Sequence, residues 1–126
     1  MKRVVVAAVL LVVAVAVVFV CNFVFEREMR SFENELNGLL DVADELTEKE
    51  LTDRAEKIAF QWNESAGVLR SIVLHNGVDE LGRSILSLPQ IIEYSGKGEM
   101  KKICIEAINM IKNLRECEEL RMENIL

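Results

Sequence analysis

The stretch VVVAAVLLVVAVAVVFVCNFVFEREMRSFENELNGLLDVADEL, residues 4–46, decides the fold because its composition changes abruptly near its middle. Residues 4–25 carry one strongly polar side chain, Asn22, whereas charged side chains are frequent from Glu26 onward. As a helix, residues 4–25 are roughly 33 Å long, enough to cross a hydrocarbon core of about 30 Å. In lipid, backbone N–H and C=O groups find partners only within such a helix. The sequence therefore predicts a transmembrane anchor over residues 1–25, which binds membrane lipid through residues 4–25.

A cleavable signal peptide is the main alternative for this segment. Signal peptides have an apolar region of about 7–15 residues, followed by a cleavage site of small residues. The apolar run here is longer, and its one small-x-small match, Ala14-Val15-Ala16, lies inside it. Val20 precedes Cys21, where a lipoprotein normally has a small residue. We therefore expect an anchor that is not cleaved.

The basic residues that flank the span bear on its orientation. Lys2 and Arg3 precede it, and Arg27 and Arg30 follow it closely, so the positive-inside bias is slight. We expect a single-pass protein of the cell membrane, with its N-terminus in the cytoplasm and the remainder outside.

The rest of the chain has a helical hydrophobic period throughout, and no segment alternates apolar and polar residues over the length of a strand. The predicted fold class is all-α: the transmembrane helix extends into a stalk, and an antiparallel three-helix bundle follows. Because the stalk has its own apolar stripe, it can also pack beside the bundle as a fourth helix. The predicted ranges are 26–46 for the stalk, 47–126 for the bundle, and 47–75, 78–94 and 98–121 for its helices.

Four short signals set these boundaries. Thr47–Glu50 has the pattern of a capping box, which starts a helix. His75-Asn76-Gly77 is typical of a helix end, with Gly77 in the left-handed conformation. Pro89 should kink or split the helix that contains it. Ser95-Gly96-Lys97-Gly98 is expected to form a loop. Within the stalk, Gly38 is a point where the helix could loosen.

Charge and cysteine content exclude several classes of protein. All 21 acidic residues and all but two of the 15 basic residues lie in 26–126, so this part carries an excess of eight negative charges. Phosphate backbones repel such a domain, which argues against nucleic-acid binding. Cys104 and Cys117 lie about 20 Å apart on one predicted helix, too far for a disulfide within the chain. We expect Cys104 and Cys117 to act as small apolar residues in or beside the core. The alternative is that one of them forms an intermolecular disulfide.

Trp62 and His75 are the only tryptophan and the only histidine. On an ideal helix their side chains point about 140° apart, so they do not share a face. Trp62 falls on the stripe of Ile58 and Leu69 and is expected in the core. His75 is predicted at a helix C-terminus, where its charged form is stabilised by free carbonyl groups. A role as a pH sensor is the alternative for His75.

No pattern of catalytic or metal-binding residues occurs in the chain. One histidine and two distant cysteines do not supply the roughly four ligands of a zinc site. The serines that could act as nucleophiles have no glycine-rich elbow beside them. The Ser95–Gly98 segment lacks the length and the preceding strand of a phosphate-binding loop. We predict that the protein is not an enzyme and that it has no cofactor and no metal.

Several features together resemble a known family. They are the short basic start, one span, an all-helical remainder, Trp62 followed thirteen residues later by His75, and the closing Glu123-Asn124-Ile125-Leu126. The chain is similar to a family of small, uncharacterised single-pass membrane proteins of Gram-positive, often spore-forming, bacteria, defined as a domain of unknown function. Pro89 departs from that pattern. The resemblance implies the anchor and the helical domain, but no activity.

Two functional hypotheses follow. The first is a membrane-anchored interaction or scaffold protein, whose partner is another envelope protein or a second copy of the chain. The stalk stripe of Phe32, Leu36 and Leu39 would pair with the partner, and the tail at Asn124 and Ile125 would add an apolar contact. The alternative is an extracytoplasmic sensor of pH or of a small-molecule ligand of unknown identity, which acts through a partner.

Overall fold

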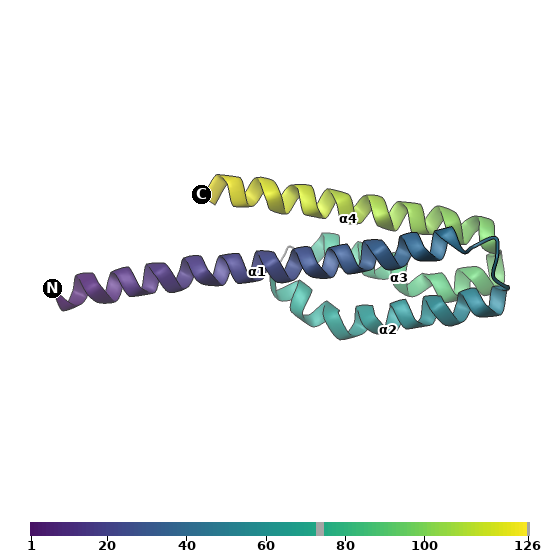
Figure 1. The fold of residues 1–126 in the computed structure, drawn as a ribbon, viewed down its shortest axis with the longest axis horizontal. Helices are drawn as coiled ribbons and strands as arrows, with labels where there is room; N and C mark the ends of the chain where they lie inside the picture. The colour runs from purple at the N-terminus through teal and green to yellow at the C-terminus, as the bar shows by residue number, and fades with distance from the viewer. Residues whose placement is uncertain (73–74, 126) are drawn as a thin grey trace.

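The computed structural model describes residues 1–72 and 75–125, with the side chains of all of these residues other than His75, Asn76 and Ile125. It contains the four helices α1 (Lys2–Asp41), α2 (Glu48–Ile72), α3 (His75–Ser95) and α4 (Lys97–Ile125). Each of α1 and α3 packs against both α2 and α4, which gives an antiparallel four-helix bundle (Figure 1). The described residues contain no strand. The all-α prediction is confirmed, and the stalk forms the first helix of the bundle.

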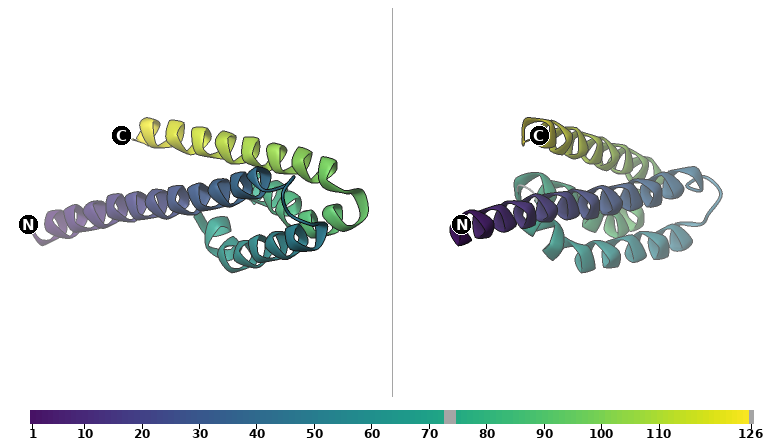
Figure 2. Two further views of the ribbon diagram at one scale, coloured as in Figure 1. Left: turned by 45° about the vertical axis from the view of Figure 1, so that its right-hand side comes forward. Right: turned by 60° about the vertical axis from the view of Figure 1, so that its left-hand side comes forward.

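Helix α1 has two parts that differ in their surroundings. It is 40 residues long and continues through Gly38, so the predicted loosening there is wrong. All of residues 1–17 are exposed, and this half of α1 extends beyond the other helices (Figures 1 and 2). The second half buries one stripe with intervals of four and three residues, the spacing of helices that pack as coiled coils. The helical residues of this stripe are Phe25, Met29, Phe32, Leu36 and Leu39.

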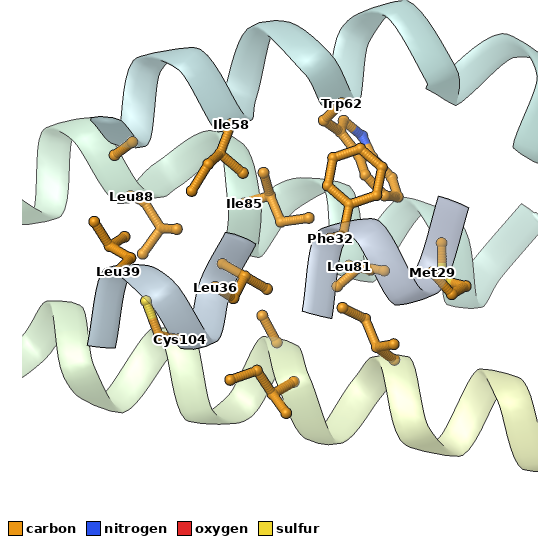
Figure 3. Packing of buried hydrophobic residues seen from close by; sticks show 14 of the residues in the cluster. Met29, Phe32, Leu36, Leu39, Ile58, Trp62, Leu81, Ile85, Leu88 and Cys104 are labelled. Atoms are coloured by element: carbon orange, nitrogen blue, oxygen red, sulfur yellow. The ribbon is translucent and has the colours of Figure 1, made fainter. Parts of the chain in front are cut away.

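The core of the bundle takes one such stripe from every helix. Figure 3 shows part of this core, in which labelled side chains from all four helices point into the space between them. The helical hydrophobic period predicted for the chain after the span is confirmed by one buried stripe on α2 and one on α3, and on α4 such a stripe is buried as far as Ile111. The core residues of the last three helices are Leu51, Ala55, Ile58, Trp62, Ala66 and Leu69 on α2, Val78, Leu81, Ile85, Leu88 and Ile92 on α3, and Met100, Cys104, Ala107, Ile108 and Ile111 on α4.

The turn between α1 and α2 occupies residues 42–47. The predicted capping box is present: the Glu50 N–H donates to the Thr47 hydroxyl at 3.2 Å, and the Thr47 N–H donates to the Glu50 carboxylate at 3.4 Å. These two bonds satisfy backbone donors that a helix start leaves free. From α4, Lys97 Nζ donates to the Leu46 carbonyl at 2.7 Å, so the turn is also fixed to the end of the bundle.

The boundary between α2 and α3 differs from the prediction. Helix α2 ends at Ile72, and His75 and Gly77 belong to the first turn of α3. Val73 and Leu74, which the prediction assigned to the preceding helix, lie outside the described residues. Gly77 does not have a positive φ; instead, a Cβ atom added to it would lie 2.5 Å from Cδ2 of Leu114. This glycine therefore permits close approach of α3 and α4.

The boundary between α3 and α4 is also tighter than expected. The predicted loop reduces to Gly96, whose φ of +86° is favourable only for glycine, and whose N–H donates to the Ile91 carbonyl at 3.0 Å. Pro89 does not split α3, although it cannot donate a hydrogen bond to the Ile85 carbonyl. Leu88 and Ile92 are both fully buried, so packing of the helix on either side of Pro89 outweighs the lost bond.

Candidate functional site

The predicted residue Trp62 lies in the core, where it joins three helices. Its ring meets Phe32 of α1 edge to face, with 5.2 Å between centroids and 64° between ring planes (Figure 3). A Cβ atom added to Gly82 of α3 would lie only 2.7 Å from Nε1 of the indole. Aromatic pairs of this geometry add about 0.5–1.5 kcal/mol beyond the area they bury. Trp62 is thus held on both sides, and 1% of its surface is exposed.

The stripe of Phe32, Leu36 and Leu39, predicted to pair with a partner, packs inside the molecule's own bundle. None of these side chains is more than 2% exposed. A second chain could reach them only if the bundle opened. The structure therefore gives the stripe an intramolecular role, because α2 and α4 supply the apolar surface that the sequence alone left unassigned.

The remaining predicted residues lie at the ends of helices. His75 is the first residue of α3, so the role predicted for it at a helix C-terminus is wrong. Asn124 is exposed in the last turn of α4, and Ile125 is the final residue of that helix. Leu126 lies outside the described residues.

A polar cluster that the sequence analysis missed lies between α1 and α4. Arg115 of α4 reaches two glutamates on α1: its Nη2 lies 3.1 Å from Oε2 of Glu26, and its Nη1 lies 2.9 Å from Oε2 of Glu33. The hydrogen bond to Glu26 and the negative charge of both glutamates raise the pKa of the Arg115 guanidinium. Arg115 therefore stays charged and fixes α4 against α1.

The spacing of these glutamates in the sequence is a signal from which polar contacts between helices could have been predicted. Glu26 and Glu33 are seven residues apart and each follows a buried position, Phe25 and Phe32. In helices with a heptad stripe, such flanking positions commonly carry polar contacts between helices. On the other flank of α1, Glu28 accepts a hydrogen bond from Ser65 of α2 at 3.0 Å. The partner of each glutamate could not be read from the sequence, because it depends on which helices become neighbours.

An open groove of about 490 Å³ runs beside this cluster. Its walls carry both acidic and basic side chains, together with Asn22 and Met122. The charged residues that line it are Glu26, Lys112, Arg115, Glu116 and Glu119. In the described part of the chain, no group of three or more His, Cys, Asp or Glu residues is placed to hold a metal ion. The arrangement pairs charges across a helix interface, and it offers a surface that can accept a partner with both positive and negative groups.

The cysteines occupy three different environments. Cys104 is buried in the core, and burial raises the pKa of its thiol to about 12. Its thiol is therefore protonated at neutral pH and unreactive. Cys117 is exposed on α4 and Cys21 is half-buried on α1. Of the two cysteines considered for an intermolecular disulfide, only Cys117 is accessible on the folded bundle.

These features define a class of protein: a helical-bundle domain that shares its first helix with an apolar segment long enough to cross a membrane. A family model described as "Domain of unknown function (DUF4363)" matches residues 19–125, and the chain belongs to this family. The matched region begins inside α1 and includes the whole bundle. A search of curated proteins and a search of solved structures each found no match.

Proposed function

We propose that this protein is a non-catalytic, membrane-anchored interaction or scaffold module, whose bundle lies outside the cytoplasm. The observation that carries the proposal is the dual use of α1. One unbroken helix contains an apolar window of 18 residues, none of them buried, and also contributes a wall of the bundle. We also propose, from the family resemblance, that the protein comes from a Gram-positive, often spore-forming, bacterium.

The continuity of α1 has a mechanical consequence. A flexible linker between anchor and domain would let the domain sample many orientations. Here the α1 backbone stays helical from Lys2 to Asp41, so the bundle keeps a fixed height and direction relative to the anchor. A scaffold benefits from this arrangement, because a partner binds a surface that is already oriented.

The partner we propose is another envelope protein or a second copy of this chain. The acidic surface argues against nucleic acid, as the charge excess already indicated. Because the apolar stripe of α1 is buried, a partner would bind the solvent-exposed faces of the bundle helices. Phe60 on α2 and Tyr94 on α3 are the most exposed aromatic side chains beyond Phe25, at 66% and 80%. Exposed aromatic residues are enriched where proteins bind one another.

Topology is the first test of this proposal. A phosphatase that is active only outside the cytoplasm is fused after Leu126, and a fluorescent protein that folds only in the cytoplasm is fused at the same place. We expect an active, full-length phosphatase in the membrane fraction and a dark fluorescent fusion. The reverse pattern would place the bundle in the cytoplasm, and a shortened soluble product would show that the segment is a cleaved signal.

Partner contact is tested by photo-crosslinking in cells. A photoreactive amino acid replaces Phe60 or Tyr94, and the matched control carries it at Leu36, which is buried. We expect intermolecular products from the exposed positions and none from the control. If all three positions gave only uncrosslinked monomer, the scaffold hypothesis would lose its support.

A further inference from the structure

The register between α1 and α4 fixes how far α4 reaches along α1. At the far end of the bundle, Lys101 Nζ lies 2.6 Å from Oδ1 of Asp44, just beyond α1. Fourteen residues further along α4, Arg115 binds both Glu26 and Glu33 and thus lies opposite the region of Met29. The two helices are antiparallel and both advance about 1.5 Å per residue, so these contacts define one consistent register.

The same register places the end of α4 beside the apolar half of α1. Seven residues beyond Arg115, Met122 lies opposite Asn22, and both residues line the same groove. Helix α4 continues to Ile125, which brings its last turn opposite the region of Phe19. Figure 1 shows α4 extending past the ends of α2 and α3 that face the N-terminus of α1. We call residues 120–125 the α4 foot.

The boundary of the bilayer falls at the same level. Lys2 and Arg3 mark one membrane surface, and about 20 residues are needed to cross the hydrocarbon core, which places the other boundary near Phe23. Arg27 and Arg30 are exposed just above this level. Helix side chains lean toward the N-terminus of their helix, so these arginines lean toward the phosphate layer. The α4 foot therefore begins at the boundary and ends slightly below it.

We propose that the α4 foot is a second membrane contact, seated in the interfacial layer of the bilayer beside the span. This inference rests on the proposed transmembrane role of α1. The occupant of the exposed foot is phospholipid: the apolar side chain of Leu120 is 60% exposed at this level, and Met122 lines the groove together with Asn22 of α1. Glu119 and Glu123 do not prevent this, because the interfacial layer consists of polar headgroups, among which charged side chains of an interfacial helix stay solvated.

The contact explains why the polar groove lies where it does. Lys112, Arg115 and Glu116 are on its water-facing side, whereas Met122 and Asn22 are at the level of the lipid. The mixture of acidic and basic groups suits zwitterionic headgroups, which carry a phosphate and an ammonium group. With two contacts of unequal depth, the bundle is held against rotation as well as against loss from the membrane.

The test uses the full-length chain in phosphatidylcholine vesicles. Cys21→Ser and Cys117→Ser remove the accessible thiols, and Cys104 stays because it is buried. An environment-sensitive fluorophore is then attached at Leu120→Cys, at Val12→Cys in the middle of the span, or at Tyr94→Cys on α3. These three side chains are exposed, so the labels are tolerated without repacking. Lipids with a spin label near the glycerol or deep in the acyl chain serve as quenchers.

We expect the label at position 120 to be quenched by the shallow spin label, the label at 12 by the deep one, and the label at 94 by neither. If position 120 behaves like position 94 while position 12 is quenched, the span holds and the lipid contact of the foot is overturned. A label at 120 that is shielded from water but not quenched by lipid overturns it too, in favour of a protein neighbour. If position 12 is not quenched, the proposed span fails, and the inference fails with it.

Discussion

The two halves of α1 belong to one helix but are built for different solvents. In residues 4–20 apolar side chains point in every direction and are exposed in the structure, apart from a partly covered Val18. From Phe25 onward, only one stripe is apolar, and it is buried. A helix that is apolar all round needs lipid or a large core, whereas a single stripe needs only neighbouring helices. The difference shows that the distribution of apolar residues, not their number, decides what covers a helix.

The boundary between the halves is not sharp. Toward the N-terminus from Phe25, Val18 and Asn22 continue the spacing of three and four residues that the buried stripe of α1 has, and both are partly covered. The bundle stripe therefore begins before the apolar segment ends. This overlap is what brings the α4 foot to the level of the span.

The largest expected effect separates the two halves directly. Leu36→Ala removes a fully buried side chain and should lower the free energy of unfolding by about 2–5 kcal/mol. Leu11→Ala makes the same change at an exposed position, and the bundle should lose less than about 0.5 kcal/mol. Urea unfolding in detergent micelles, followed by the emission of the single tryptophan, measures both values. Equal losses would show that the halves do not differ as described.

A second pair of variants compares the inside and the outside of the bundle. A Cβ atom on Gly82 would overlap the rigid indole of Trp62, so Gly82→Ala should cost about 1–3 kcal/mol. Nothing lies within 4 Å of the same atom on Gly67, so Gly67→Ala should stabilise the helix by about 0.5–1 kcal/mol. The same urea titration measures whether each variant raises or lowers the free energy of unfolding. Stabilisation by Gly82→Ala would contradict the close contact with Trp62.

A smaller effect is expected from the ion pairs that join the bundle half of α1 to α4. Arg115 is 31% exposed, so its pairs are partly screened, and Arg115→Met should cost about 1 kcal/mol. The loss should shrink in high salt, because salt screens exposed charges. Lys57→Met is the control, since Lys57 is exposed and makes no ion pair within the described residues. A loss independent of salt would instead indicate a packing role for the arginine.

The smallest effect concerns pH at the far end of the bundle. The hydrogen bond and the charge of Lys101 hold the pKa of Asp44 below its usual value. A carboxyl group with a lowered pKa stabilises the fold above its ordinary pKa of about 3.9, and this contribution is lost as the pH falls through the folded value. Between about pH 5 and pH 2, the Tm of the wild type should therefore fall slightly more than that of Asp44→Asn. Thermal unfolding followed by circular dichroism tests this, and Lys101→Met should behave like Asp44→Asn.

Much of the architecture could be predicted from local patterns. The apolar run, the apolar stripes of the helices and the Thr47–Glu50 capping box depend on residues within a few positions of one another. The structure confirms the box and the stripes, except that the stripe of α4 is buried only as far as Ile111. The errors occur where local signals compete with packing. Gly77 has the chemistry of a helix end, but it lies within a helix because α3 and α4 approach closely there. Pro89 is tolerated within α3 because the buried side chains of Leu88 and Ile92 hold the helix in place on either side of it.

The sequence by itself determined that the chain is all-α, that α1 begins with a segment suited to lipid, and that Trp62 belongs to a core. Each of these follows from the period and composition of neighbouring residues. Only the tertiary structure decided that the stripe of Phe32, Leu36 and Leu39 is covered internally, that Arg115 binds Glu26 and Glu33, and that the α4 foot lies beside the span. These contacts join residues more than twenty positions apart, and they depend on the order and register in which the helices pack.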